Sequence, residues 1–219
     1  AVLAWVDENG AVYEKMPEED VVLYAVTGFE ASMAGVEKTY DGEAAKLEVV
    51  TAGEGYEYTY AWKKDGAPLG ETGSFIEIVN VADSGEYTCT VTGTGKYGEV
   101  FEQTIAASVS VAQAQNSVSK AQIEGWTYAE TAKTPSATAA FGTAAFRYFE
   151  EDGKTVIDGV PENAGSYYVQ AYVAADAAGN YTAAESELVS FAVAKAENAI
   201  TSMTADGWTP SGWLSCWTL

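Results

Sequence analysis

The chain has 219 residues, of which 32 are acidic and 11 basic, and its net charge is −21. This surplus of acidic residues disfavours binding to nucleic acid or to an anionic membrane, because both partners need basic contacts. The chain contains no histidine, which excludes Ser-His-Asp and Cys-His catalysis within it. No apolar run reaches the length of a transmembrane helix, so we expect no membrane insertion within these residues.

The first 27 residues contain two β signals. Asn9-Gly10 is the strongest short signal for a hairpin turn, and 21–26 (VVLYAV) is a strand candidate. The segment resembles the closing half of a Listeria–Bacteroides repeat, a small β-grasp-like module of surface proteins. The residues that carry this resemblance are Trp5, Asp7, Asn9, Gly10, Tyr13, 16–20 and 23–25. Two or three strands are not stable alone, so residues 1–27 should form a partial β-grasp-like hairpin that packs on a neighbour or frays.

Residues 28–113 are expected to form a complete β-sandwich. Strands rich in Val, Ile, Tyr and Phe are predicted at 46–50, 56–62, 75–78 and 106–112. In 56–62 (YEYTYAW) the period of two places three tyrosines and Trp62 on one face of the strand. The spacing favours a core position for Trp62, and a sugar-stacking platform is the alternative for the tyrosines.

A tight turn follows in the run 83–89 (DSGEYTC), which begins about 20 residues after Trp62 and is typical of an immunoglobulin-fold corner. Tyr87 lies where a corner tyrosine bonds back to the backbone. The strand before Trp62 has no cysteine, so the inter-sheet disulfide of that fold is absent and Cys89 should be a buried, inert thiol. We expect no disulfide with Cys216. This region resembles bacterial immunoglobulin-like domains of secreted and surface proteins.

Residues 114–195 repeat this pattern as a second sandwich. Asn163, Gly165, Tyr167 and Val169 stand in the positions of Asp83, Gly85, Tyr87 and Cys89. The module resembles the MBG-type immunoglobulin-like repeats of large adhesins from Gram-positive gut bacteria. Residues 174–179 (AADAAG) are expected to be an exposed loop, and Asn180 begins a formal N-glycosylation acceptor that means little in a bacterium. The join at 111–116 lacks Gly and Pro, so we expect it to be semi-rigid and the particle elongated.

A passage at 109–127 recurs at 191–209 with a period of about 82 residues, which marks a tandem array. The shared residues are Ala114, Asn116, Gly125, Trp126 and Thr127, which recur as Ala196, Asn198, Gly207, Trp208 and Thr209. Residues 196–219 are therefore expected to be the truncated start of a third repeat or an irregular tail, with a short specialised cap as the alternative. The predicted fold class is all-β: tandem immunoglobulin-like sandwiches after a partial β-grasp-like hairpin.

These features predict a non-catalytic extracellular spacer or stalk segment of a modular bacterial cell-surface, adhesin-like protein, monomeric and without cofactor or metal. The alternative is a binding module that uses the tyrosine-rich sheet or the end loops to recognise a host glycan or an extracellular protein. Structural calcium between modules stays open, although the EF-hand pattern is absent. We expect no enzyme, because a sandwich of this size leaves little room for a cleft of several hundred cubic ångströms.

A Lys–Asn isopeptide crosslink would need a buried lysine beside an asparagine. Lys38, Lys46 and Lys120 lie near the starts of the two expected modules. The last strands expected, 106–112 and 188–193, contain no asparagine. We therefore expect no crosslink of this kind.

Overall fold

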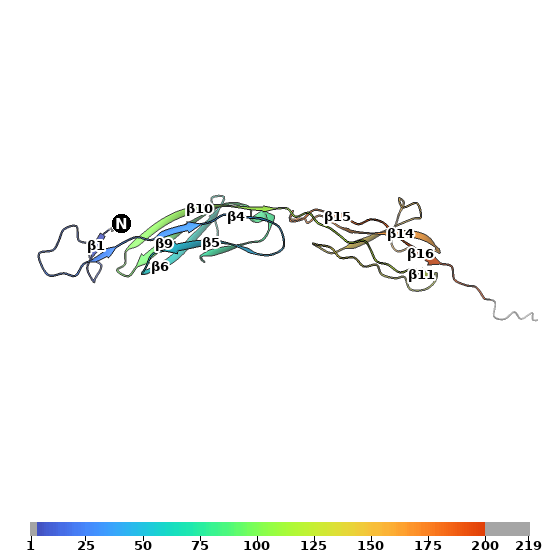
Figure 1. Ribbon diagram of the computed structural model, residues 1–219, viewed down its shortest axis with the longest axis horizontal. Helices are drawn as coiled ribbons and strands as arrows, with labels where there is room; N and C mark the ends of the chain where they lie inside the picture. The colour runs from blue at the N-terminus through green and yellow to red at the C-terminus, as the bar shows by residue number, and fades with distance from the viewer. Residues whose placement is uncertain (1–3, 200–219) are drawn as a thin grey trace, which may run out of the picture.

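The computed structural model describes residues 4–199. Figure 1 shows an elongated molecule in which a small N-terminal unit and two β-sandwiches follow one another along the long axis. Apart from the 3-10 turn η1 (Val81–Asp83), these residues contain strands and loops but no helix, which confirms the predicted all-β fold class. The strands are β1 Ala4–Val6, β2 Tyr24–Val26, β3 Glu30–Met33, β4 Val36–Thr39, β5 Ala45–Ala52, β6 Tyr56–Lys64, β7 Ala67–Pro68, β8 Phe75–Ile78, β9 Gly85–Gly95, β10 Val100–Ala112, β11 Trp126–Thr127, β12 Ala145–Phe149, β13 Val156–Ile157, β14 Gly165–Val173, β15 Ala184–Glu185 and β16 Val189–Ala194.

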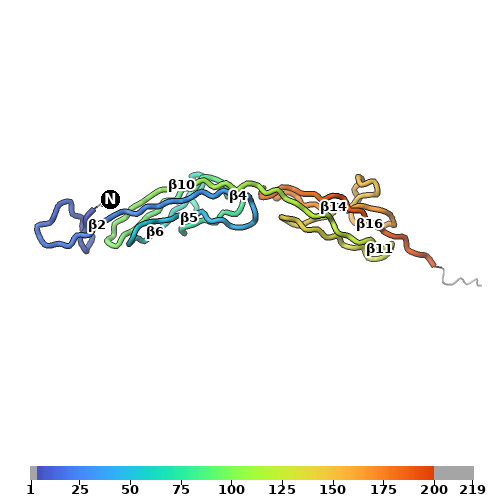
Figure 2. Tube along the Cα trace, in the orientation of Figure 1, coloured from blue at the N-terminus to red at the C-terminus, as the bar shows by residue number. Residues whose placement is uncertain are grey.

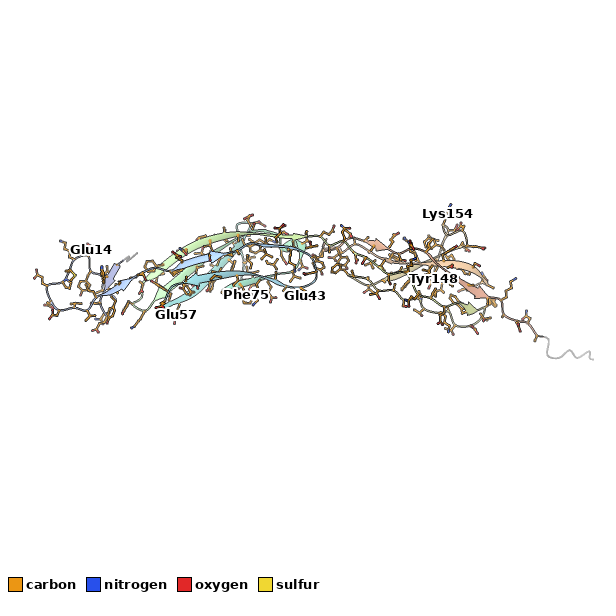
Figure 3. The ribbon with its side chains drawn as sticks, viewed as in Figure 1. Glu14, Glu43, Glu57, Phe75, Tyr148 and Lys154 are labelled. Carbon is orange, nitrogen blue, oxygen red and sulfur yellow. The ribbon has the colours of Figure 1, made fainter. Side chains whose placement is uncertain are left out.

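The first sandwich packs a three-stranded sheet, β3-β5-β8, against a five-stranded sheet, β4-β10-β9-β6-β7. Apolar residues alternate along β6, β9 and the end of β10, so each strand buries one face and exposes the other. In β6, Trp62 is only 1% exposed, while Glu57 points outward from the same strand (Figure 3). The most deeply buried side chains of this core are Leu47, Trp62, Ile78, Cys89 and Val91.

The predicted strands lie close to the observed ones, with one extension. β10 begins at Val100, earlier than the predicted start of the 106–112 strand. β9 and β10 form a long antiparallel hairpin whose register runs from Val100↔Thr94 to Val109↔Gly85. The part of β10 before residue 106 alternates exposed and half-buried residues, and the half-buried Phe101 and Ile105 pack against the edge of the core.

Both predicted corner tyrosines are present and buried. The Tyr87 hydroxyl donates to the Asp83 carbonyl oxygen at 2.8 Å, and the Tyr167 hydroxyl donates to the Asn163 carbonyl oxygen at 2.9 Å. The exposed fractions of the two tyrosines are 3% and 8%. The same turn thus begins β9 in the first sandwich and β14 in the second, as the sequence predicted.

A short strand pairs in parallel with the last strand of each sandwich. β4 pairs in parallel with β10, and β11 pairs in parallel with β16. Each ladder is continued by one more bond: the Tyr40 N–H donates to the Ala112 carbonyl at 2.9 Å, and the Tyr128 N–H donates to the Ala194 carbonyl at 2.8 Å. These two bonds establish which residues of the two sandwiches are equivalent.

A glycine precedes each of these parallel strands for a steric reason. A Cβ atom at Gly35 would lie 2.6 Å from the Ser108 carbonyl oxygen, and one at Gly125 would lie 2.6 Å from the Ala192 carbonyl oxygen. Only glycine allows the backbone to approach the last strand this closely. The glycine of the repeated Gly-Trp-Thr passage is therefore a packing requirement of the fold.

The second sandwich is smaller than the first. Its main sheet is β11-β16-β14-β12-β13, with β15 paired to β14. The facing layer consists of two extended segments that meet through the bridges Val118↔Ala139 and Gln122↔Ser136. Within residues 4–199, no counterpart of β8 joins this layer. The core residues of the second sandwich are Ala121, Trp126, Tyr148, Tyr167, Val169, Ala171, Phe191 and Val193.

The N-terminal unit is a two-stranded antiparallel sheet of β1 and β2. The predicted Asn9-Gly10 turn is present, with Gly10 at a φ of +82° and its N–H bonded to the Asp7 carbonyl at 3.1 Å. The unit packs on the β9–β10 turn, where the Tyr24 ring stacks on the Tyr97 ring at a centroid distance of 5.1 Å. This agrees with the expectation that so small a sheet needs a neighbour.

Candidate functional site: the junction between the two sandwiches

A single residue separates the two sandwiches along the chain. β10 ends at Ala112, and Ala114 already forms a parallel bridge with Tyr181 of the second sandwich. Ala114 is buried, and Gln113 between them donates its side-chain amide to the Gly179 carbonyl at 3.0 Å. Figure 2 shows the trace passing directly from one sandwich into the next. The join thus lies within the predicted range 111–116, and Gln113 is its one connecting residue.

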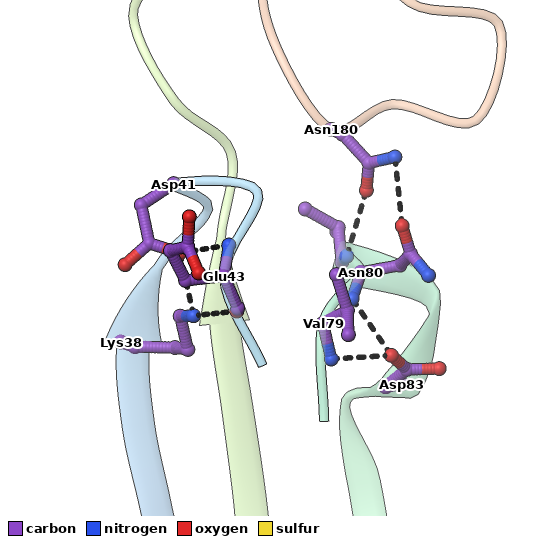
Figure 4. A network of polar contacts seen from close by, with 8 residues as sticks. Lys38, Asp41, Glu43, Val79, Asn80, Asp83 and Asn180 are labelled. Atoms are coloured by element: carbon purple, nitrogen blue, oxygen red, sulfur yellow. Dashed lines mark hydrogen bonds and ion pairs between the residues drawn. The ribbon is translucent and has the colours of Figure 1, made fainter. Parts of the chain in front are cut away.

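Asn180 fastens the second sandwich to the first. It ends the loop of residues 174–180, where Gly179 adopts a φ of +79° and the Asn180 N–H bonds to an Asp176 carboxylate oxygen at 3.1 Å. Its side-chain Oδ1 accepts the Val81 N–H at 2.9 Å, and its Nδ2 donates to Asn80 Oδ1 at 3.2 Å (Figure 4). Asn180 is only 6% exposed, so the supposed glycosylation acceptor is a buried junction residue.

The first sandwich presents its side of this contact through the same turn that holds the corner tyrosine. Asp83 Oδ2 accepts the Val79 N–H at 2.9 Å and the Asn80 N–H at 2.7 Å (Figure 4). The carbonyl of Asp83 accepts the Tyr87 hydroxyl. The corner therefore anchors η1, and η1 directs the Val81 N–H and the Asn80 side chain toward the second sandwich.

Three aromatic rings form the other half of the junction. Phe141 and Tyr181 stack at 5.6 Å with an interplanar angle of 14°, and Tyr40 of the first sandwich lies 5.4 Å from Phe141 and 6.3 Å from Tyr181. Asn116 holds the backbone of Phe141 in place, accepting its N–H at 3.0 Å and donating to its carbonyl at 3.1 Å. Ring pairs at these distances stabilise a contact beyond their buried area.

An ion pair stiffens the loop that carries Tyr40. Lys38 Nζ lies 2.6 Å from an Asp41 carboxylate oxygen and 2.5 Å from the Glu43 carbonyl oxygen (Figure 4). The hydrogen bond from Lys38 holds the pKa of the Asp41 carboxyl below its ordinary value. The lowered pKa extends toward acid pH the range in which the Asp41 carboxylate is charged and can pair with Lys38.

Two kinds of contact, hydrogen bonds and ring contacts, link the two sandwiches. Asn180 supplies the hydrogen bonds, and Tyr40 supplies the ring contacts from the first sandwich. Each hydrogen bond contributes about 0.5–1.5 kcal/mol, so the orientation is held by the number of contacts and by the short connection. The sequence predicts the position of the join, but not the roles of Asn80, Asn180 and Tyr40, because their partners are distant in the chain.

The three tyrosines of β6 pack against other residues of the first sandwich. Tyr56, Tyr58 and Tyr60 are half-buried, and the ring of Phe29 lies 5.8 Å from Tyr56 and 5.1 Å from Tyr58. The Tyr58 hydroxyl donates to the Gly53 carbonyl at 3.3 Å. The Trp62 indole N–H donates to a carbonyl of its own sandwich at 2.8 Å, which agrees with the predicted core position of Trp62.

Cys89 lies in the first core with no exposed surface. Burial raises the pKa of its thiol to about 11, so the reactive thiolate form is disfavoured at neutral pH. The expected character of Cys89, a small buried apolar residue, is confirmed. The expectation of no Cys89–Cys216 disulfide involves Cys216, which lies outside the described residues.

The lysines considered for a crosslink have other partners. Lys46 Nζ lies 4.1 Å above the centre of the Phe75 ring, and Lys120 Nζ lies 2.5 Å from a Glu187 carboxylate oxygen at the exposed surface. Lys38 is held by Asp41, as described above. Within residues 4–199, His, Cys, Asp and Glu side chains form no group of three that could hold a metal ion. The same residues include no helix long and apolar enough to cross a membrane.

The second sandwich carries several open surface hollows, although a module of this size was expected to leave little room for a cleft. One of ≈ 550 Å³ includes a single carboxylate, Glu124, in its lining. Another, of ≈ 320 Å³, is lined partly by Glu150, Asp158 and Glu162. A third, of ≈ 620 Å³, lies beside Tyr128 and has no carboxylate. The lack of enzymatic activity stays a prediction.

The first sandwich can be assigned by comparison. Residues 49–107 match the family model of the immunoglobulin domain. The chain thus contains an immunoglobulin-like module, as expected from the corner and the position of Trp62. A search of the curated proteins returned no match.

Several solved structures match the chain at low sequence identity. The N-terminal Ig1-2 module of the Drosophila receptor protein tyrosine phosphatase DLAR has 12% identity and a TM-score of 0.28, over 78% of this chain and 100% of that one. The fibronectin(III)-like modules of Clostridium thermocellum CbhA have 14% identity and a TM-score of 0.27, over 80% and 100%. The I9–I11 tandem from titin has 11% identity and a TM-score of 0.37, over 83% and 72%. Scores of this size add nothing to the assignment.

Proposed function

We propose that this chain is a non-catalytic spacer, which holds the segments on either side of it at a set distance and direction. The observation that carries the proposal is the junction, where Asn180 bonds to Val81 and Asn80 across a one-residue connection. A flexible linker would need none of these contacts, because its ends are free to move. The elongated arrangement in Figure 1 supports the same role.

The setting that we propose for this spacer is the outer surface of a bacterium, in an adhesin-like protein. The resemblance of residues 114–195 to MBG-type repeats and of residues 1–27 to a Listeria–Bacteroides repeat supports this setting. The net charge of −21 favours a solvated, monomeric chain, because like charges repel neighbouring copies. It also argues against nucleic acid as a partner.

Binding of a host glycan or an extracellular protein is the weaker alternative. The rings of Tyr56 and Tyr58 contact Phe29, and their hydroxyls bond to backbone carbonyls of Thr27 and Gly53. A stacking platform needs ring faces that are open to a ligand. These contacts occupy part of each ring, so they support a packing role more than a platform.

The spacer proposal can be tested by measuring how rigid the junction is. Spin labels would be placed at Glu57→Cys in the first sandwich and Val156→Cys in the second, both exposed, in a Cys216→Ser background. Pulsed electron resonance should give one narrow distance distribution for the full-length chain. A matched chain with a Gly-Ser insertion beside Gln113 should give a broad one. Equal widths in the two chains would refute the proposal.

A further inference from the structure

The far end of the second sandwich repeats the design of the first junction. The Tyr40 N–H bonds to Ala112 and the Tyr128 N–H bonds to Ala194, so Ala112 and Ala194 are equivalent. Counting onward, Ala196 takes the position of Ala114, and Asn198 takes the position of Asn116. The sequence repeat and the hydrogen-bond pattern therefore agree on the same alignment.

The equivalent residues have different surroundings at the two places. Ala114 is 3% exposed and pairs with the second sandwich through Asn180 and Thr182. Asn116 forms side-chain hydrogen bonds that hold Phe141. Ala196 and Asn198 carry the same side chains but are exposed. At the first junction, the alanine and the asparagine are the residues through which the chain enters the following sandwich.

The surface next to Ala196 is hollowed and carries exposed apolar side chains among polar ones. Tyr128, the counterpart of Tyr40, is 48% exposed, and Val160, the counterpart of Asn80, is 41% exposed. Tyr128 lines two hollows, of ≈ 620 and ≈ 410 Å³; the first reaches Ala196 and Asn198, and the second reaches Val160 and the carboxylates Glu130 and Glu162. Exposed Tyr128 and Val160 side chains beside hollows, on an otherwise acidic chain, favour a contact with another module.

One position differs in a way that specifies the occupant. Val81 supplies the N–H that Asn180 accepts at the first junction. Its counterpart, counted back from the equivalent residues Asp83 and Asn163, is Pro161, which has no N–H. An asparagine docked there would lose this hydrogen bond, and a buried polar group without a partner is costly.

We propose that this end is a docking surface for a further immunoglobulin-like module, entered through Ala196 and Asn198, whose loop tip carries an apolar residue where the second sandwich has Asn180. The inference rests on the proposed spacer function and on continuity with the first junction. Tyr128 stacks on the aromatic residues of the incoming module, as Tyr40 does on Phe141 and Tyr181. The exposed Val160 side chain then covers its apolar tip.

The test extends the full chain by one module. Residues 196–219 are replaced by a second copy of 114–195, so that the copy's Ala114 takes the place of Ala196. Two versions differ only at the loop tip of the added copy, which carries either its own Asn180 or Asn180→Leu. Spin labels at Val156→Cys in the original second sandwich and at Glu151→Cys in the added copy report the new junction by pulsed electron resonance.

We expect the leucine tip to give a narrower distance distribution than the asparagine tip, and slower hydrogen exchange at residues 195–198. Tyr128→Ala should broaden the distribution, whereas Leu188→Ala, an exposed apolar residue outside both hollows, should not. The proposal is overturned if the distance distribution with the leucine tip is no narrower than that with the asparagine tip. It is also overturned if the unextended chain sediments as a dimer and the Tyr128→Ala variant sediments as a monomer. The label pair Glu57→Cys and Val156→Cys is measured in parallel across the first junction. A narrow distribution there, with a broad one at the new junction, means that the docking proposal fails while the spacer proposal stands.

Discussion

The side-chain oxygen of Asn180 accepts a hydrogen bond from the backbone N–H of Val81 at 2.9 Å, across the junction of the two sandwiches. The two residues are far apart in the chain, and each is held by a local turn of its own sandwich. The bond therefore links two rigid turns rather than two flexible loops. This makes it a sensitive point for testing how the sandwiches are held.

The Asn180→Ala variant should lose protection at the Val81 amide. Removing the acceptor leaves a partly buried N–H without its partner, at a cost of about 1–3 kcal/mol. Hydrogen exchange at Val81 should therefore become faster by about ten- to a hundredfold. The control is Asn198→Ala, the same change at an exposed position, which should leave the Val81 amide unaffected. Unchanged exchange at Val81 in the Asn180 variant would contradict this account of the junction.

The corner tyrosines should contribute to stability through their hydroxyls. Each hydroxyl donates to a carbonyl oxygen four residues upstream and is buried there. Tyr87→Phe and Tyr167→Phe should each lower the free energy of unfolding of their own sandwich by about 1 kcal/mol. Urea denaturation measures the change, with Tyr172→Phe as the control, since its hydroxyl forms no hydrogen bond with the described residues. If the Tyr87→Phe variant kept the full free energy of unfolding, the structural role of the corner hydroxyl would be contradicted.

The two close-approach glycines should tolerate no side chain. In Gly35→Ala and Gly125→Ala the added Cβ would meet a carbonyl oxygen of the last strand at 2.6 Å. The backbone must shift, and overpacking of this kind costs about 1–3 kcal/mol. Gly70→Ala is the control, because a Cβ there meets nothing within 4 Å. Thermal unfolding should separate the first two variants from the third, and similar melting temperatures for all three would contradict the steric argument.

Cys89 should be unreactive until the first sandwich unfolds. Because burial raises the pKa of the thiol from 9.0 to about 11, the folded state favours the protonated form. The associated stability is fully present below pH 9 and is lost as the pH rises through about 11. In a Cys216→Ser background, a thiol reagent at pH 8 should label the denatured chain and leave the native chain unlabelled. Rapid labelling of the native protein would show that Cys89 is accessible.

Much of the fold was predictable because it depends on near neighbours in the chain. The alternation in 56–62 places Trp62 inside, since successive strand residues face opposite sides. The run 83–89 predicts the corner, since the Tyr87 hydroxyl reaches a carbonyl only four residues away. The end of β10 and the beginning of the second sandwich were likewise located from local composition.

The junction could not be predicted in the same way. Asn180 follows a short loop whose composition indicates only exposure, and its partners are Val81 and Asn80 of the other sandwich. No local pattern distinguishes an asparagine in a solvated loop from one that bonds across a module boundary. The smaller second layer of the second sandwich was also missed, because the sequence pattern indicates extended segments without showing how few bridges join them.

By itself, the sequence determined that this is an all-β tandem protein with two corners of one design and a repeated Gly-Trp-Thr passage. Those are local or periodic properties, which near-neighbour sterics and hydrophobic alternation impose on the chain. Only the tertiary structure decided why Gly125 must be glycine, since the obstacle is a carbonyl oxygen of Ala192 on a strand much later in the chain. It also decided how the sandwiches are held together, because hydrogen bonds and ring contacts between distant residues exist only once both cores have formed.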